Sequence, residues 1–344
     1  ISGGLVGSEM CIRDRVWSSI SWFTLTLGIL LGSIWAYYEL GWGGYWFWDP
    51  VENVSLMPWI AGTAFSHSLI YSRTKIMLSW MVFLSIITFL LSVFGSFIVR
   101  SGILNSVHSF AADPDRGIFL LGILSIFTLA SFIIFFRSKD IFKGNWPKFG
   151  SINYLLLLNN ILLMTILLII LLGTLYPIFT EVIYESKLSI GPNYFSELIT
   201  PLTIALIGLF TFEQFLRLKG KVFFLSALSL VVLSTGLYFF FEQMIFLSLI
   251  TAGVLCIVLF FNLFISILNH QTSLRMHKLF GHLSVAALTF SVLFNHNFSE
   301  SVDIKVSEGD QMNLLNSKIF FEKVEIVTDS NFNGVRAKLS LIHI

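Results

Sequence analysis

The stretch WGGYWFWDPVENVSLMPWIAGTAFSHSL, residues 42–69, joins a dense cluster of aromatic residues to an apolar segment. Aromatic belts at a membrane surface scatter Trp and Tyr residues over helix ends, whereas this cluster is continuous and includes a pair of glycines. Two interpretations stay open: an interfacial belt, or a platform for a large, flat, apolar ligand. The Asp49-Pro50 pair predicts a helix start, because Asp is a good N-cap and Pro suits the first helical position.

The composition of the whole chain predicts a polytopic membrane protein. Its 344 residues are 56% hydrophobic and 12% charged, whereas soluble domains carry about 25% charged residues. The formal net charge of +1 argues against a nucleic-acid role, which favours a basic face. The two cysteines form no CxxC pair, so neither a disulfide framework nor a thiol redox motif is expected.

Both ends of the chain have a sequence that we expect to be foreign to the protein. Residues 9–15, EMCIRDR, and residues 339–344, LSLIHI, can be encoded by inverted copies of one DNA string. Such a pair is typical of a sequencing adapter read through as protein, so residues 1–15 and 339–344 are excluded from fold reasoning. Cys11 is excluded with them, and Cys256 is then expected to be a small core residue of an apolar helix.

Apolar runs of about 20 residues, the length that crosses a bilayer, predict an all-α bundle over residues 16–297 with about nine transmembrane helices. The expected spans are 17–38, 57–71, 76–99, 117–136, 152–175, 195–216, 222–240, 244–268 and 279–297. Alternate connections between them then lie on the same side of the membrane.

Basic residues gather in one set of these connections, which the positive-inside rule places in the cytoplasm. This set holds Arg73, Lys75, Arg137, Lys139, Lys143, Lys148, Arg217, Lys219, Lys221, Arg275 and Lys278. The opposite set contains the tryptophan segment 42–59, the loops 100–116 and 176–194, and the tail from residue 298. Residues 298–338 of this tail alternate apolar and polar side chains, which predicts the start of an outward-facing β-rich domain.

Two histidines lie inside apolar spans, where an ionisable side chain is costly and marks function. His67 lies near the cytoplasmic end of its span and His282 near the cytoplasmic start of another, so the two imidazoles are expected at similar depth. Facing each other across a bundle, they could bind one haem iron axially. The alternative is that each histidine bonds separately to backbone or hydroxyl groups.

His108 lies in the outward loop 100–116, on the same side as the tryptophan segment. An imidazole beside an aromatic surface suits a transiently held porphyrin, since aromatic faces contact the macrocycle and nitrogen binds iron. Arg100 is a candidate partner for the porphyrin propionates.

Residues 42–69 closely resemble the WWD signature of haem-handling membrane proteins, in the form found in the CcmF family of cytochrome c maturation factors. Three further segments resemble the same family: FIVRSGILNSVHSFAADPDRGIF (97–119), GTLYPIFTEVI with KLSIGPNYF (173–195), and GHLSVA (281–286). The likeness extends over about residues 17–338. One departure is Tyr45, where the family more often has Trp, and an aromatic face is retained there.

The resemblance implies a haem lyase component of cytochrome c biogenesis, an enzyme subunit acting within a complex in the bacterial inner (plasma) membrane. Haem would arrive from a periplasmic, CcmE-like haem chaperone and dock on the WWD platform, which comprises Trp42, Trp46, Trp48 and Asp49. It would then be attached through its vinyl groups to the cysteines of a CxxCH motif in apocytochrome c. No catalytic residue is assigned on this chain, because the thiols belong to the substrate. Lyase subunits of the CcmH and CcmI type are implied as further partners.

The resemblance also assigns the histidines. His67 and His282 match the family's two membrane histidines, the axial ligands of a buried haem b that could supply an electron to the delivered haem. His108 matches the second of two outward histidines that ligate the iron of the delivered haem. The first lies upstream of the WWD segment in the family, so we expect it in sequence preceding this chain.

Three rival interpretations remain. A specialised, NrfE-like paralogue would serve one multihaem cytochrome, and neighbouring genes would distinguish it. A transporter of haem or a small solute would need a polar path, and no paired broken helices are evident. A b-type cytochrome that only carries electrons would leave the tryptophan segment and His108 without a purpose.

Overall fold

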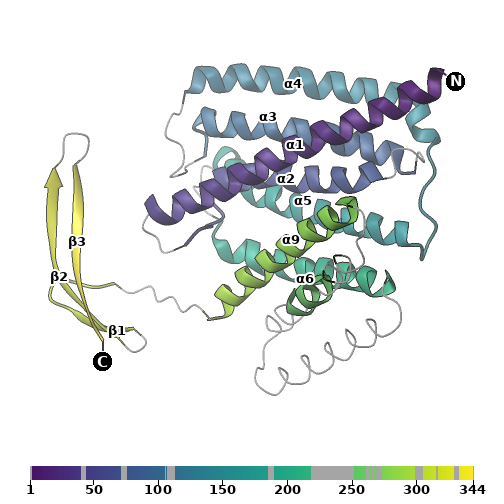
Figure 1. Ribbon diagram of the computed structural model, residues 1–344. Coiled ribbons are helices and arrows are strands. Elements are labelled where there is room, and N and C mark those ends of the chain that lie inside the picture. Colours follow the sequence, from purple (N-terminus) through teal and green to yellow (C-terminus); the bar gives the residue numbers. More distant parts are fainter. Residues whose placement is uncertain are drawn as a thin grey trace. The chain divides into compact units, whose positions relative to one another are not determined.

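The structure is a computed structural model that forms two compact units, Ile1–Phe290 and Ser291–Ile344, each considered separately below (Figure 1). It describes residues 2–39, 44–70, 76–104, 106, 113–184, 190–217, 252–260, 264, 267, 273–298, 305–314, 317–328 and 333–343.

Helices make up the first unit. They are α1 (Ser2–Glu39), α2 (Pro50–Ser68), α3 (Leu78–Ser101), α4 (Pro114–Arg137), the short 3₁₀ helix η2 (Lys139–Lys143), α5 (Ile152–Tyr184), α6 (Pro192–Arg217) and α9 (Ser273–Phe298), which continues into the second unit. Segment 252–260 is also helical and contains the half-buried Cys256.

Five helices of the described part are long and apolar enough to cross a membrane: α3, α4, and most of α1, α5 and α6. They correspond to the predicted spans 17–38, 76–99, 117–136, 152–175 and 195–216. The predicted span 222–240 and most of 244–268 lie outside the described residues. The count of about nine crossings therefore stays a prediction.

Helix α2 begins earlier than the predicted span 57–71, and the reason is its N-terminal cap. Asp49 is the N-cap, its side chain accepts from the backbone N–H of Val51, and Pro50 occupies the first helical position. Glu52 completes a capping box by accepting from the backbone N–H of Asp49. The predicted helix start at Asp49-Pro50 is confirmed, and residues 50–59 are helical rather than part of a connection.

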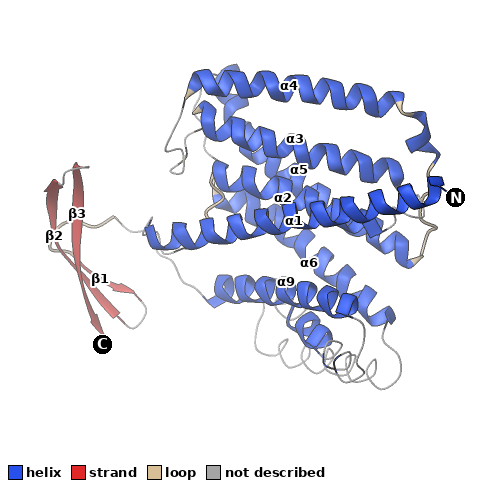
Figure 2. Ribbon diagram, turned by 45° about the horizontal axis from the view of Figure 1, so that its top comes forward, coloured by secondary structure: helices blue, strands red, loops and turns tan. Residues whose placement is uncertain are grey.

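Helix α2 is the central helix of the first unit. It packs against α1, α3 and α5, while α4 covers α3 and α6 covers α5 (Figures 1 and 2). Met57, Ala61 and Ala64 on α2 are completely buried in the core. The close contact with α3 depends on Gly95, where an added Cβ would lie 3.2 Å from the carbonyl oxygen of Val54. Helix α2 is thereby packed closely against α3 along its buried face.

Two reciprocal indole–hydroxyl hydrogen bonds connect α1 to α2. Trp59 donates to Thr26 at 2.8 Å and Trp22 donates to Thr63 at 2.9 Å. The two indoles also stack, with ring centroids 5.7 Å apart. Trp59, the last tryptophan of the segment 42–59, is therefore a packing residue between two helices.

The second unit contains a three-stranded antiparallel sheet in the order β1-β2-β3. Its strands are β1 (Gln311–Leu314), β2 (Ser317–Thr328) and β3 (Asn333–His343), and β2 pairs with both others. The strands agree with the β-rich tail predicted from residue 298 onward. Strand β3 includes residues 339–343 of the segment expected to be foreign, whose origin stays a prediction.

Candidate functional site

The N-terminal end of α2, which the sequence predicts to face outward and which is called its outward end here, carries the aromatic segment with the constrained residue Trp48. The C-terminal end of α2 is called its inner end. The φ of Trp48, 59°, is in the left-handed region, which is a genuine outlier for a bulky side chain. Three contacts hold it there: its ring stacks on Phe195 of α6 at 4.9 Å, its ring meets Trp46 edge-on at 6.0 Å, and its carbonyl accepts from Asn53. Strained backbone maintained by its surroundings is typical of functional sites.

Buried polar side chains in the first turn of α2 stabilise the turn around Trp48. Asn53 is 1% exposed, and its amide donates both to the Trp48 carbonyl and to Thr174 of α5. The Glu52 carboxylate, itself buried, accepts from the backbone N–H groups of Phe47 and Asp49. The turn is thus connected to α5 and α6 as well as to its own helix.

Asp49 also links the aromatic segment to the loop after α3. The hydroxyl of Ser106 donates to the Asp49 carboxylate at 2.5 Å. Ser106 precedes His108 by two residues in the sequence.

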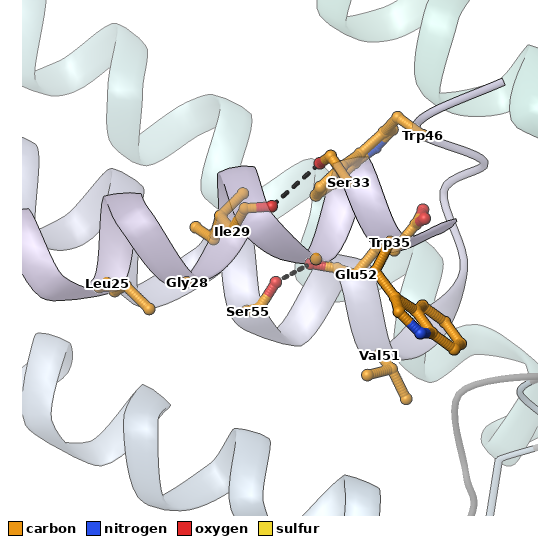
Figure 3. A pocket seen from close by; sticks show the side chains of 10 residues that line it. Leu25, Gly28, Ile29, Ser33, Trp35, Trp46, Val51, Glu52 and Ser55 are labelled. Atoms are coloured by element: carbon orange, nitrogen blue, oxygen red, sulfur yellow. Dashed lines mark hydrogen bonds between the residues drawn. The ribbon is translucent and has the colours of Figure 1, made fainter. Parts of the chain in front are cut away.

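A groove of about 240 Å³ lies between α1 and the start of α2 (Figure 3). Gly28 and Gly32 form its wall on α1, and an added Cβ at either glycine would meet no atom within 4 Å. Trp35 and Trp46 also line it. Pockets for whole ligands of drug size have volumes of about 300–1,000 Å³, so this groove is too small to enclose a large flat ligand.

The structure describes only part of the predicted outward site. Trp42 and His108 lie outside the described residues. Arg100 lies in the last turn of α3, with an exposed side chain, and its carbonyl accepts from the Asp113 N–H. Among the residues that the structure describes, Trp46, Trp48 and Asp49 form the outward cluster.

The inner end of α2 carries His67, which faces His282 of α9. Their imidazole centroids are 6.3 Å apart, and the ring planes differ by only 7°. Phe210 of α6 lies 4.9 Å from the His282 ring. The structure therefore brings together the two histidines that the sequence places at similar depth in separate spans.

The centroid separation is about the distance at which two imidazoles could share one metal ion, since a metal–nitrogen bond is about 2 Å and a ring nitrogen lies about 1 Å from its ring centre. Within the described part of the chain no group of three or more His, Cys, Asp or Glu side chains could hold a metal. A pair of imidazoles alone suits an ion whose remaining ligands come from a macrocycle, as in haem.

Adjacent asparagines of α5 contact this end of α2, and these were not among the predicted site residues. Asn159 Nδ2 lies 3.2 Å from Nδ1 of His67, and Asn160 donates to the hydroxyl of Ser68 at 2.9 Å. Their signal was present in the sequence as two amides inside the otherwise apolar run LLLLNNILLM, since polar residues in a span mark buried contacts or function.

Comparisons with known proteins agree with this fold. The family described as "Cytochrome C assembly protein" matches residues 14–104, which include the whole outward end of α2. The chain is 35% identical to "Cytochrome c-type biogenesis protein CcmF" of Pseudomonas aeruginosa, over 98% of this chain and 54% of that protein. It is 41% identical to "Probable cytochrome c-type biogenesis protein NrfE" of Escherichia coli, over 64% of this chain and 40% of that protein.

A solved structure, "Cytochrome c Heme Lyase CcmF", matches the fold with a TM-score of 0.69 and 21% identity, over 96% of this chain and 53% of that one. Taken with the apolar helices, these findings define a multi-pass membrane protein of the cytochrome c assembly class. Within that class the chain belongs to the CcmF family, which confirms the resemblance of residues 42–69. It spans about half the length of the curated CcmF relatives that it matches.

Proposed function

We propose that this chain is the haem-positioning part of a cytochrome c haem lyase, with a resident haem b at the inner end of α2 and a delivered haem at the outward end. The observation that carries the proposal is the His67–His282 pair, whose near-parallel rings have centroids 6.3 Å apart. Family membership supports the reaction class, because the relatives are cytochrome c biogenesis proteins.

At the inner site His67 and His282 would hold the iron through one nitrogen each. The haem supplies a centre that takes up and releases one electron. The chain's own residues orient the imidazoles: Asn159 contacts His67, and Phe210 packs beside His282. Two imidazole ligands would favour a low-spin iron, and the apolar helices around the pair would limit the access of water.

At the outward site the aromatic side chains of Trp42, Trp46 and Trp48 would receive the macrocycle of the delivered haem, with Asp49 and Glu52 holding the turn. The 240 Å³ groove beside Trp46 is suited to one edge of it. His108 is the proposed axial ligand for the iron, and Arg100 the proposed partner for a propionate. The supporting contact is the hydrogen bond from Ser106, two residues before His108 in the sequence, to Asp49.

The covalent bonds then form between the two substrates, the delivered haem and the apocytochrome. Each thiol of the CxxCH motif adds across a vinyl group: a C–S bond forms, the S–H bond and the vinyl π bond break, and the proton goes to the other vinyl carbon. The addition consumes no oxidant, and the iron must stay reduced, which is the role proposed for the inner haem. The chain's contribution is proximity and orientation of the two reactants.

The partners proposed with this role are a CcmE-like haem chaperone, apocytochrome c and lyase subunits of the CcmH and CcmI type. The proposed location is the bacterial inner membrane, with the tryptophan segment and the C-terminal sheet in the periplasm. The supporting observation is the concentration of Lys and Arg in the opposite set of connections.

A second candidate function is haem attachment to one particular multihaem cytochrome. It is favoured by the 41% identity to the protein named NrfE. Introducing the complete gene into strains that lack either a general or a dedicated lyase subunit separates the two, because a dedicated lyase restores only its own cytochrome.

The inner site is tested by the optical spectrum of the complete, purified protein. Substituting His67→Ala or His282→Ala is expected to abolish the bound haem b, since each removes one of two axial ligands. His277→Ala is the matched control, because His277 lies five residues earlier in α9 and is expected to leave the spectrum unchanged. An unaltered low-spin spectrum in either ligand variant would refute the assignment.

A further inference from the structure

Two neighbouring amides of α5 contact two neighbouring residues at the inner end of α2. Asn159 lies 3.2 Å from Nδ1 of His67, and Asn160 donates to Ser68 at 2.9 Å. The Ser68 hydroxyl gives its single proton to the carbonyl of Ala64, so it can only accept from Asn160. The orientation of the Asn160 amide is therefore fixed, and this contact is a packing contact between two helices.

The contact of Asn159 with His67 has a different chemistry. Asn159 contacts Nδ1 of His67, so Nε2 is the nitrogen through which this histidine would bind the proposed iron. A nitrogen that ligates a metal carries no proton, so the neutral ring has its proton on Nδ1 and must donate from there. The structure places Nδ2 of Asn159 at 3.2 Å from this nitrogen. Rotation of the amide about its last side-chain bond replaces the NH₂ group by the carbonyl oxygen, which can accept from Nδ1–H.

We infer that Asn159 is a positioning residue of the inner haem site: its carbonyl oxygen accepts the Nδ1–H of His67, which fixes the tautomer and ring orientation needed for Nε2 to bind iron. This inference rests on the proposed function of the His67–His282 pair. It extends that proposal to a residue on a third helix, so the site draws on α2, α5 and α9.

The hydrogen bond has a predictable electronic effect. An acceptor at Nδ1 increases the basicity of Nε2, and a more basic ligand stabilises the more positive, oxidised iron. Removing the acceptor therefore favours the reduced iron and raises the reduction potential. A negatively charged acceptor has the opposite effect.

The test compares Asn159→Leu, Asn159→Asp and Asn160→Leu in the complete protein, with redox titration of the bound haem b and measurement of haem affinity. Asn160→Leu is the matched control, because it makes the same chemical change one residue along and breaks the contact with Ser68 instead. Asn159→Leu is expected to raise the midpoint potential and to weaken haem binding about 10–100-fold. Asn159→Asp is expected to lower the potential, and Asn160→Leu to leave it unchanged.

The outcomes separate this inference from the proposed function. Both the proposed function and the inference on Asn159 are supported if His67→Ala loses haem and if Asn159→Leu and Asn159→Asp shift the midpoint potential in opposite directions. If His67→Ala loses haem but Asn159→Leu keeps the original potential and affinity, the inference on Asn159 is wrong and the site stands. Equal shifts in Asn159→Leu and Asn160→Leu also overturn it, because they indicate general loosening between α2 and α5. An unaltered protein that holds no haem b overturns the proposed function itself.

Discussion

The two ends of α2 are built in different ways. At the outward end most contacts are local: Asp49 and Glu52 bind backbone N–H groups within five residues of themselves, and Asn53 reaches back to Trp48. At the inner end the contacts join residues far apart in the sequence, with Asn159 and Asn160 bonded to partners 92 residues away. The outward turn is therefore held largely by contacts within a few residues, with added support from α5 and α6, whereas the inner site exists only when three helices are assembled.

This difference predicts that damage to one end leaves the other end functional. Sites on α2 that are well separated and share no partner have nearly additive effects on stability. Three substitutions test the comparison, and each is followed by thermal unfolding of the complete protein in detergent and by its content of haem b.

The largest effect is expected for Glu52→Ala at the outward end. It leaves the backbone N–H groups of Phe47 and Asp49 without their carboxylate acceptor, and hydrogen bonds to charged groups contribute about 1.5–3 kcal/mol each. We expect about 3 kcal/mol lower stability with haem b content unchanged. Glu52→Gln keeps an acceptor oxygen and should lose about half as much. Loss of haem b in the alanine variant would show that the two ends are coupled.

A smaller effect is expected for Ser68→Ala at the inner end. The substitution removes the acceptor of the completely buried Asn160 amide, and an unsatisfied buried polar group costs about 1–3 kcal/mol. Ser66→Ala is the control, because Ser66 makes the same kind of bond within the helix, to the carbonyl of Gly62. Equal unfolding temperatures of the two variants would contradict a stabilising role for the Asn160–Ser68 contact.

The smallest effect on stability is expected for Ser106→Ala, which removes one hydrogen bond to Asp49 and costs about 1 kcal/mol. Its functional effect is confined to the outward site: capture of added haem should weaken while haem b remains bound. Ser106→Thr retains a hydroxyl and should behave like the unaltered protein. If Ser106→Ala captured added haem as well as the unaltered protein, the role proposed for this hydrogen bond would be wrong.

The same difference between the ends explains what could be predicted from the sequence. The cap at Asp49-Pro50 was predictable because its partners are within a few residues, and the membrane class follows from the long apolar runs. The resemblance of residues 42–69 identified the family because its motif is a contiguous segment. The depth argument for His67 and His282 succeeded in placing them together because it used only span direction and position within each span.

Contacts between distant segments were not predictable in this way. Nothing local to Asn159 indicates that it meets His67, and the stacking of Trp48 on Phe195 depends on how α6 packs beside α2. Trp59 belongs by sequence to the aromatic segment, yet its hydrogen bond to Thr26 makes it a contact between α1 and α2. The difference between platform and packing tryptophans is decided by tertiary neighbours that a single sequence does not reveal.

The most direct test of the central claim is electron paramagnetic resonance of the oxidised, complete protein with His67 or His282 replaced by Gly, before and after addition of free imidazole. Each substitution removes one axial ligand and leaves room for a ligand of the same kind. If both histidines bind one iron, each glycine variant loses the low-spin signal of the unaltered protein, and imidazole restores it. A low-spin signal that persists in either variant without imidazole would show that the two residues do not share an iron.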